Sequence, residues 1–184
     1  MIVTRSGNSA AMFDQIIIAD HSHLNDINQL VNMAYRPDSS KQTWTNETGI
    51  IHGPRIKPQQ LAELIGKAKS FILLGFIKQQ MVACAHIQQQ DDTAYIGMLT
   101  VDTQRQNAGL GKQILDKAEQ FASQQLGCTT FQLSVISVRE SLIQFYLRRG
   151  YQRTGELQPY PLQANAGTPI VDNLHIESLI KVVD

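Results

Sequence analysis

The sequence predicts a mixed α/β domain in which a twisted, mostly antiparallel sheet is flanked by helices. The length supports one domain, since 184 residues lie within the usual size of a single globular unit. Stretches with strand-like alternation are also interspersed with stretches that have helical spacing. Three strand-like stretches follow one another with connections short enough for antiparallel hairpins. We expect the domain to extend over residues 1–184, with residues 1–12 as a loose polar tail.

The N-terminal part of the chain predicts a strand followed by two helices. Residues 13–19 have the pattern of a strand, and the apolar spacing after it indicates a helix that ends before Pro37. Residues 36–57 show no period, which indicates a long loop of the kind that often carries function. Pro58 suits the first position of a second helix.

The remaining residues predict six strands and two helices in the order βββαβαββ. Gly127 and Gly150 are expected to end the two helices, because glycine adopts the left-handed conformation at a helix end. The expected strands are 71–77, 81–88, 94–101, 131–136, 151–157 and 174–182, the expected helices are 110–126 and 139–149, and 158–173 is expected to be loop.

The composition argues against several classes of partner. Sixteen basic residues balance sixteen acidic ones, so no basic face for nucleic acid is expected. Cys84 and Cys128 have no metal-ligand spacing and suit a reducing compartment. The N-terminus lacks the uninterrupted apolar core of a signal peptide, and no stretch is long and apolar enough for a membrane span. We therefore expect a cytoplasmic protein with no metal, membrane or nucleic-acid partner.

The most informative local feature is the segment 106–112, Gln-Asn-Ala-Gly-Leu-Gly-Lys, between an expected strand and an expected helix. Glycines at the start of a helix let backbone N–H groups approach a phosphate, which the helix dipole also favours. The dinucleotide pattern G-x-G-x-x-G fails because Ile114 occupies its third position, and the P-loop pattern fails at Gln113. Helix-packing glycines are the alternative explanation.

Two motifs resemble the GNAT N-acetyltransferase superfamily. Gln106, Gly109 and Gly111 match its Gln/Arg-x-x-Gly-x-Gly/Ala signature, and residues 145–151 are similar to its Tyr-x-x-x-Gly-aromatic helix end. The resemblance implies a GNAT-like fold, splayed between the fourth strand, 94–101, and the fifth, 131–136. It also implies acetyl-CoA as co-substrate and transfer of its acetyl group to a primary amine of a small molecule or peptide by direct attack.

The same resemblance assigns roles to particular residues. Tyr146 matches the general acid near the thioester sulfur, with packing at the helix end as the alternative. The strand end would pair its backbone with the pantetheine arm, and the loop amides would bind the pyrophosphate. The cofactor-binding residues implied in this way are Leu99, Thr100, Val101, Gln106, Asn107, Ala108, Gly109, Leu110, Gly111 and Lys112.

Four positions depart from the family pattern or lie outside it. Arg139 stands where many relatives have a cofactor-binding Asn, so it binds a cofactor phosphate or the substrate, or is simply exposed. Tyr95 stands where some relatives have a catalytic Glu, so no base is implied there. We expect Glu47 to act as base and, beside Trp44, to bind the substrate amine. The alternative is a solvated turn residue beside a loop anchor.

Other interpretations remain open. His86 and Cys84 alternate on one expected strand, where a core role outweighs a Cys–His nucleophile pair. The acceptor is expected between the 36–57 loop and the 158–173 segment. A non-catalytic acyl-CoA-binding or regulatory domain is the main functional alternative, and a CoA-independent interaction protein is another. The sequence leaves open a homodimer, the identity of the acceptor, and acetyl against longer acyl donors.

Overall fold

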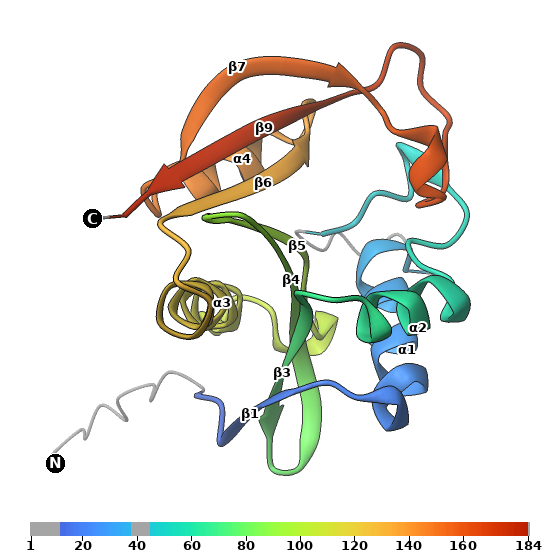
Figure 1. Ribbon diagram of the computed structural model, residues 1–184. Helices are drawn as coiled ribbons and strands as arrows, with labels where there is room; N and C mark the ends of the chain where they lie inside the picture. The colour runs from blue at the N-terminus through green and yellow to red at the C-terminus, as the bar shows by residue number, and fades with distance from the viewer. Residues whose placement is uncertain (1–11, 38–44, 184) are drawn as a thin grey trace, which may run out of the picture.

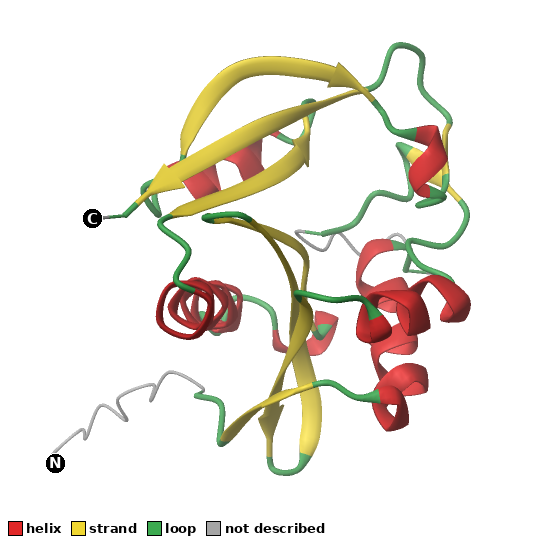
Figure 2. Cartoon of the chain, in the orientation of Figure 1, coloured by secondary structure: helices red, strands yellow, loops and turns green. Residues whose placement is uncertain are grey.

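A computed structural model describes residues 12–37 and 45–183 of the chain. It contains one large sheet and one small sheet, with helices against both faces of the large one (Figures 1 and 2). The elements in chain order are β1 (Gln15–Ile18), α1 (Leu24–Tyr35), β2 (Ile51–His52), α2 (Pro58–Gly66), β3 (Ser70–Ile77), β4 (Gln80–Gln90), β5 (Thr93–Val101), α3 (Leu110–Leu126), β6 (Thr130–Ile136), α4 (Glu140–Leu147), β7 (Gln152–Pro159), β8 (Thr168–Pro169) and β9 (His175–Val182). Three short 3-10 helices are η1 (His21–His23), η2 (Thr103–Arg105) and η3 (Leu162–Ala164).

The large sheet confirms the predicted fold class. Its strand order is β1-β3-β4-β5-β6-β9-β7, and every neighbouring pair is antiparallel except β5 and β6. In Figure 1, α3 lies on one side of β3, β4 and β5, and α1 and α2 lie on the other. Each helix buries an apolar face, and the two resulting cores lie on opposite faces of the sheet.

The sheet is splayed where prediction places the opening. The parallel strands β5 and β6 pair only at Thr93↔Thr130, Ala94↔Phe131 and Tyr95↔Gln132. Beyond Tyr95 the two strands separate, although β5 continues to Val101 and β6 to Ile136. The backbone of β5 that faces this opening has no strand beside it, so an extended ligand can take that place.

The small sheet is a feature that the sequence does not predict. Residues 36–57 and 158–173 are both expected as loops, yet Ile51 pairs with Pro169 and His52 with Thr168 to form β2 and β8. Two-residue strands carry no apolar period, so pattern analysis passes over them. The pairing fixes the two loops to each other on one side of the opening (Figure 1).

The other predicted elements agree with the structure within a few residues at their ends. The expected extent of the domain stays a prediction, and the expected polar tail lies outside the described residues apart from Met12. None of the described helices has the length and apolar character that a bilayer crossing requires.

Candidate functional site

The segment 106–112 forms an open cavity at the start of α3. Gly109 precedes the helix in the left-handed conformation, at φ 79°, and no atom would lie within 4 Å of an added Cβ there. The first α3 hydrogen bond runs from the Gln113 N–H to the Gly109 carbonyl at 3.1 Å, so the amides of Gly111 and Lys112 precede it. Such first-turn amides have no partner within the helix. A cavity of about 320 Å³ opens in front of them.

The walls of this cavity are strongly basic. Lys112 comes from the predicted loop, and Arg105, Arg148 and Arg149 join it from η2 and the end of α4. Four cationic side chains and a helix N-terminus together suit a diphosphate. Of the predicted cofactor residues, those that line the cavity are Val101, Gln106, Asn107, Gly109, Leu110, Gly111 and Lys112, whereas Leu99, Thr100, Ala108 and Arg139 do not.

The end of β5 contains a β-bulge beside the opening. Cys84 pairs with Thr100 and His86 with Gly97, so β5 has one residue more than β4 between these pairs. Met98 takes the left-handed conformation at φ 50°, and its carbonyl accepts a hydrogen bond from the Thr100 hydroxyl at 2.9 Å. The carbonyl of Leu99 accepts one from the Tyr35 hydroxyl at 3.1 Å. The bulge therefore holds the backbone of β5 in a fixed irregular shape at this point.

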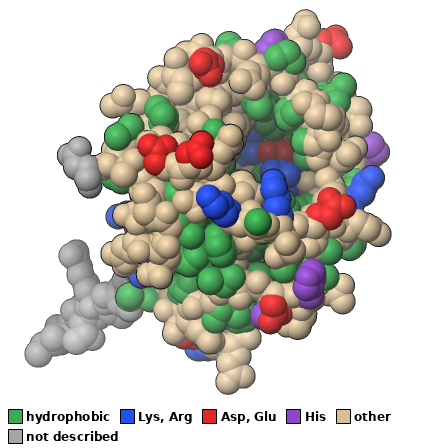
Figure 3. All heavy atoms as spheres, in the orientation of Figure 1, with side chains coloured by type: hydrophobic (Ala, Val, Ile, Leu, Met, Phe, Trp, Pro, Cys, Tyr) green, Lys and Arg blue, Asp and Glu red, His purple; other side chains and the backbone are tan. Residues whose placement is uncertain are grey.

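A second cavity of about 320 Å³ occupies the splay itself. It runs between β5 and β6 toward the loops that β2 and β8 join, and Leu142 lines both this cavity and the basic one. Figure 3 shows a hollow on this face with basic and acidic side chains inside it. We call the second cavity the cleft. Its loop end is lined by Tyr35, Glu47, Arg55, His86 and Tyr160.

Tyr146 lines the cleft from α4, where it is 6% exposed. Its ring packs edge-on against Phe145 and Tyr151, with centroids 5.2 and 5.7 Å away. Burial raises the pKa of Tyr146 above its ordinary value, and the nearby Tyr35 adds to this. The phenol therefore keeps its proton at neutral pH and can act as a hydrogen-bond donor.

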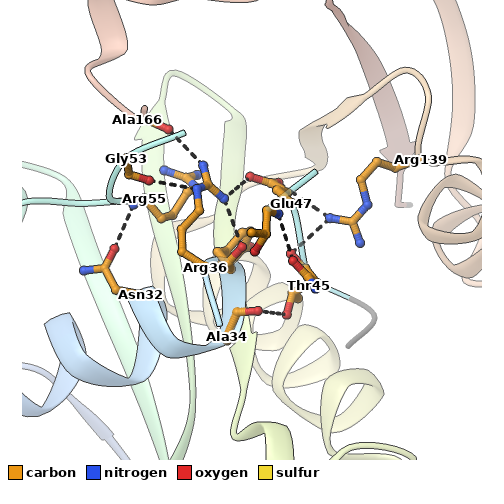
Figure 4. Close-up of polar contacts among 12 residues, drawn as sticks. Asn32, Ala34, Arg36, Thr45, Glu47, Gly53, Arg55, Arg139 and Ala166 are labelled. Atoms are coloured by element: carbon orange, nitrogen blue, oxygen red, sulfur yellow. Dashed lines mark hydrogen bonds and ion pairs between the residues drawn. The ribbon is translucent and has the colours of Figure 1, made fainter. Parts of the chain in front are cut away.

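Glu47 also lies in the cleft, held by two arginines (Figure 4). Its Oε2 pairs with Nη1 of Arg36 at 2.6 Å and its Oε1 with Nη1 of Arg139 at 3.6 Å. All three side chains are at most 10% exposed. Glu47 is therefore buried and paired, unlike a solvated turn residue. Trp44, which the sequence analysis predicts beside Glu47 as a substrate-binding residue, lies outside the described residues.

Arg139 faces the loop end of the cleft. Besides the pair with Glu47, its Nη1 donates to the Thr45 carbonyl at 3.1 Å, and the residue is 9% exposed. It does not line the basic cavity. This placement favours a role near the acceptor over contact with a cofactor phosphate, and it excludes the simply exposed alternative.

Cys84 and His86 do not form a pair with each other. The Cys84 thiol lies 3.7 Å from the Met98 carbonyl, and burial raises its pKa to about 12. His86 Nε2 lies 2.9 Å from Oγ of Ser70, whose own proton goes to the Leu64 carbonyl at 2.6 Å. Nε2 of His86 therefore carries a proton and donates it to Ser70.

Several residues that line the two cavities are missed by the sequence analysis. Arg148 and Arg149 follow Leu147, the last residue of α4, and a pair of arginines at that helix end is the signal that indicates them. Tyr35 and Arg55 have no such signal in the sequence. They lie in α1 and in the loop before α2, far along the chain from both motifs, and only the fold brings them to the cleft. Tyr160 lines the cleft as well, from the segment that follows β7.

The comparisons with known proteins agree with this architecture. The model of the family described as "Acetyltransferase (GNAT) family" matches residues 30–151, which include both motifs. The class of protein follows from the fold, the splayed strands and the family match: the chain is an acyl-CoA-dependent N-acyltransferase. The chain belongs to the GNAT acetyltransferase family and is an N-acetyltransferase. A search of curated proteins found no match.

Solved structures show the same fold at low sequence identity. An N-acetyltransferase from Staphylococcus aureus Mu50 is 14% identical with a TM-score of 0.70, over 94% of this chain and 98% of that one. The ribosomal-protein-S18-alanine N-acetyltransferase from Escherichia coli is 16% identical with a TM-score of 0.68, over 92% and 94%. A mutant of spermidine N-acetyltransferase from Vibrio cholerae is 11% identical with a TM-score of 0.68, over 91% and 92%.

Proposed function

We propose that the acyl donor is acetyl-CoA and that the acceptor is a primary amine of a small molecule or peptide, which attacks the thioester directly. The observation that carries this proposal is the meeting of the basic cavity and the cleft at Leu142. One elongated molecule can thus place phosphates at α3 and a reacting group beside Tyr146. By their names, two of the similar structures acetylate spermidine and a ribosomal-protein alanine, which are both amines.

The residues present fit the parts of acetyl-CoA. The amides of Gly111 and Lys112 and the basic side chains around them suit the diphosphate. The unpaired edge of β5 from Leu99 to Val101 suits the amides of the pantetheine arm, as an added strand would. Since the Leu99 carbonyl is bound by Tyr35, Leu99 would contribute its N–H.

In the proposed reaction, the neutral amine nitrogen attacks the thioester carbonyl carbon and forms the C–N bond. The carbonyl oxygen becomes an oxyanion, for which a backbone N–H near Leu99 is the proposed donor. The C–S bond then breaks, and the sulfur leaves with the electron pair while Tyr146 donates a hydrogen bond or its proton to it. The amine nitrogen loses a proton to the carboxylate of Glu47, the proposed base, which leaves the neutral amide.

Glu47 and Trp44 are proposed to bind the acceptor amine, with Glu47 also the proposed base. The ion pairs with Arg36 and Arg139 occupy part of the hydrogen-bonding capacity of Glu47, so the proposed role requires a lone pair of the carboxylate that these two contacts leave open. Arg139 is proposed to act through this contact. Two buried free thiols, Cys84 and Cys128, support a reducing cytoplasmic location, which cell fractionation tests. The possible homodimer stays a prediction, which light scattering tests.

Two measurements on the purified protein test the proposal. Acetyl-CoA at 100 times its Kd should stabilise the fold by about 2.7 kcal/mol in thermal unfolding. CoA release should then be detected with at least one amine of a panel of amino acids, polyamines and peptides. Stabilisation without turnover for any amine would favour a non-catalytic acyl-CoA-binding domain, and no stabilisation at all would favour a protein that does not bind CoA.

A further inference from the structure

The loop end of the cleft contains more positive than negative charge. Glu47 is the carboxylate there, and it is already paired with Arg36 and Arg139. Arg55 adds a third guanidinium group, in the cleft lining. Among the residues that the structure describes, Glu47 is thus paired with two arginines beside the cleft, and Arg55 is the arginine that lines the cleft itself.

Arg55 has no acidic partner within residues 12–37 and 45–183. Its guanidinium carbon lies 5.2 Å from the centre of the Tyr35 ring, which is a cation–π contact. No hydrogen bond from its guanidinium to the described part of the protein is found, so its five N–H donors are available to a ligand.

The backbone around Arg55 is fixed on α1. Its N–H donates to Oδ1 of Asn32 at 2.7 Å (Figure 4), and the next carbonyl, of Ile56, accepts from Nδ2 of Asn32 at 2.9 Å and of Asn28 at 3.1 Å. These contacts fix the backbone of Arg55, while the contact with the Tyr35 ring positions the guanidinium group, which therefore loses less freedom when it binds an anion.

Its charge also reaches the groups across the cleft. Burial is the main cause that lowers the pKa of His86 to about 4, and the charges of Lys67 and Arg55 lower it further. Burial raises the pKa of Tyr160, and Arg55 opposes that rise. Arg55, His86 and Tyr160 line the same cleft, so an acceptor bound there lies beside the guanidinium group.

We infer that the acceptor amine carries a carboxylate in the same molecule, and that Arg55 binds this carboxylate and thereby determines specificity. The inference rests on the proposed function, because it identifies the class of acceptor for that reaction. A guanidinium group binds a carboxylate through two parallel hydrogen bonds, which fixes orientation as well as affinity. The amine is then directed toward the thioester.

The excess positive charge has a second consequence. A nearby positive charge disfavours the ammonium form of an amine and favours the neutral form, which is the nucleophile. This helps a site in which Tyr95 stands where relatives have a base. A polyamine such as spermidine would be repelled by the same charge, since it brings several positive charges and no anion.

The test compares each amino acid with its own carboxamide as acceptor, together with spermidine, by CoA release. We expect kcat/KM to be at least about tenfold higher for the preferred acid than for its amide, as for a hydrogen bond to a charged group. Peptides with a free or amidated C-terminus, with and without acidic side chains, distinguish a main-chain carboxylate from a side-chain one.

Arg55→Met tests the residue itself, since it keeps the alkyl contact and removes the charge. It should lower kcat/KM for the acid about tenfold, mostly through KM, and change the value for the amide less than about twofold. Arg55→Lys should restore part of the loss. Arg153→Met is the matched control, because Arg153 pairs with Glu140 and Glu177 away from both cavities.

The outcomes separate the two proposals. Equal or better use of amides or spermidine, or an equal loss for acid and amide in Arg55→Met, would overturn the inference and leave the acetyl transfer intact. If no amine in the panel releases CoA, the proposed function fails, and this inference fails with it.

Discussion

The phenol of Tyr146 shows how burial selects between two roles for one side chain. A phenol has an ordinary pKa of about 10 and a thiol one of about 8.5, so a free tyrosine is a weak acid for a departing thiolate. Burial raises the pKa of Tyr146 further, so complete proton transfer becomes harder. A protonated phenol at the edge of the cleft is nevertheless a good hydrogen-bond donor to developing negative charge on sulfur.

Tyr146→Phe removes this donor and keeps the ring. We expect kcat to fall about 10- to 100-fold, as for the loss of one hydrogen bond to a charged group, with the Kd of acetyl-CoA changed less than about twofold. Steady-state kinetics and a binding titration measure the two effects. Tyr151→Phe is the control, because its ring packs against Tyr146 but does not line the cleft. Wild-type kcat in Tyr146→Phe would remove the phenol from the reaction.

Glu47→Gln separates structural from catalytic roles at a second residue. It leaves two buried guanidinium groups without their counter-charge, so we expect a loss of unfolding free energy on the order of 3 kcal/mol in urea denaturation. Turnover at neutral pH should fall as well. Glu156→Gln, on the exposed strand β7, should change neither quantity. A loss of turnover with unchanged stability would indicate the base role alone, and unchanged turnover would discard Glu47 from the chemistry.

At the scale of elements, the start of α3 combines a conformational and a binding requirement in one glycine. Gly109 and Gly127 flank the helix, both with φ in the left-handed region, at 79° and 68°. Neither has an atom within 4 Å of an added Cβ. Both therefore require glycine for backbone conformation and not for space.

Gly109→Ala and Gly127→Ala form a matched pair. Each should lower the unfolding free energy by about 1 kcal/mol or more, because alanine is strained at positive φ. Only Gly109→Ala should also weaken acetyl-CoA binding, by about tenfold or more, since it distorts the amides that face the basic cavity. Calorimetric titration measures this. Equal affinities in the two variants would show that the loop geometry does not govern donor binding.

Elements with a repeating apolar pattern could be predicted from the sequence. The helix beginning at Leu110 and the strands around it carry enough turns or alternations to define a period, and Gly127 marks an end. The strands β2 and β8 could not be predicted, because two residues define no period. The bulge at Met98 could not be predicted either, since no sequence signal marks a methionine that adopts the left-handed conformation.

At the scale of the whole molecule, one part of the candidate site could be predicted from the sequence and the other part could not. The phosphate loop is contiguous in sequence, so the motif at Gln106–Lys112 could be found by reading along the chain. The loop end of the cleft is assembled from Tyr35, Glu47, Arg55 and Tyr160, which only the folded sheet and the β2–β8 pairing bring together. The ion pairs of Glu47 with Arg36 and Arg139 likewise depend on three-dimensional contacts that sequence spacing does not encode.

Folding stability as a function of pH tests the polar part of this arrangement. His86 has a pKa of about 4 in the folded protein against an ordinary 6.5, mainly because of burial and further because of Lys67 and Arg55. Since the folded-state pKa is depressed, the unfolded chain binds a proton between pH 6.5 and 4 that the folded protein does not. Stability is therefore fully present above pH 6.5 and falls as the pH decreases toward 4, by up to about 3 kcal/mol from this group.

His86→Gln should reduce this loss, because glutamine can still donate to Ser70 but does not titrate. We expect the difference in unfolding free energy between pH 7 and pH 4.5, measured by urea denaturation, to be smaller in the variant than in the wild type. His21→Gln, at an exposed position in η1, should keep the wild-type difference. If His86→Gln also keeps it, His86 is protonated in the folded protein without cost, and its environment is more open to water than the contacts with Ser70 imply.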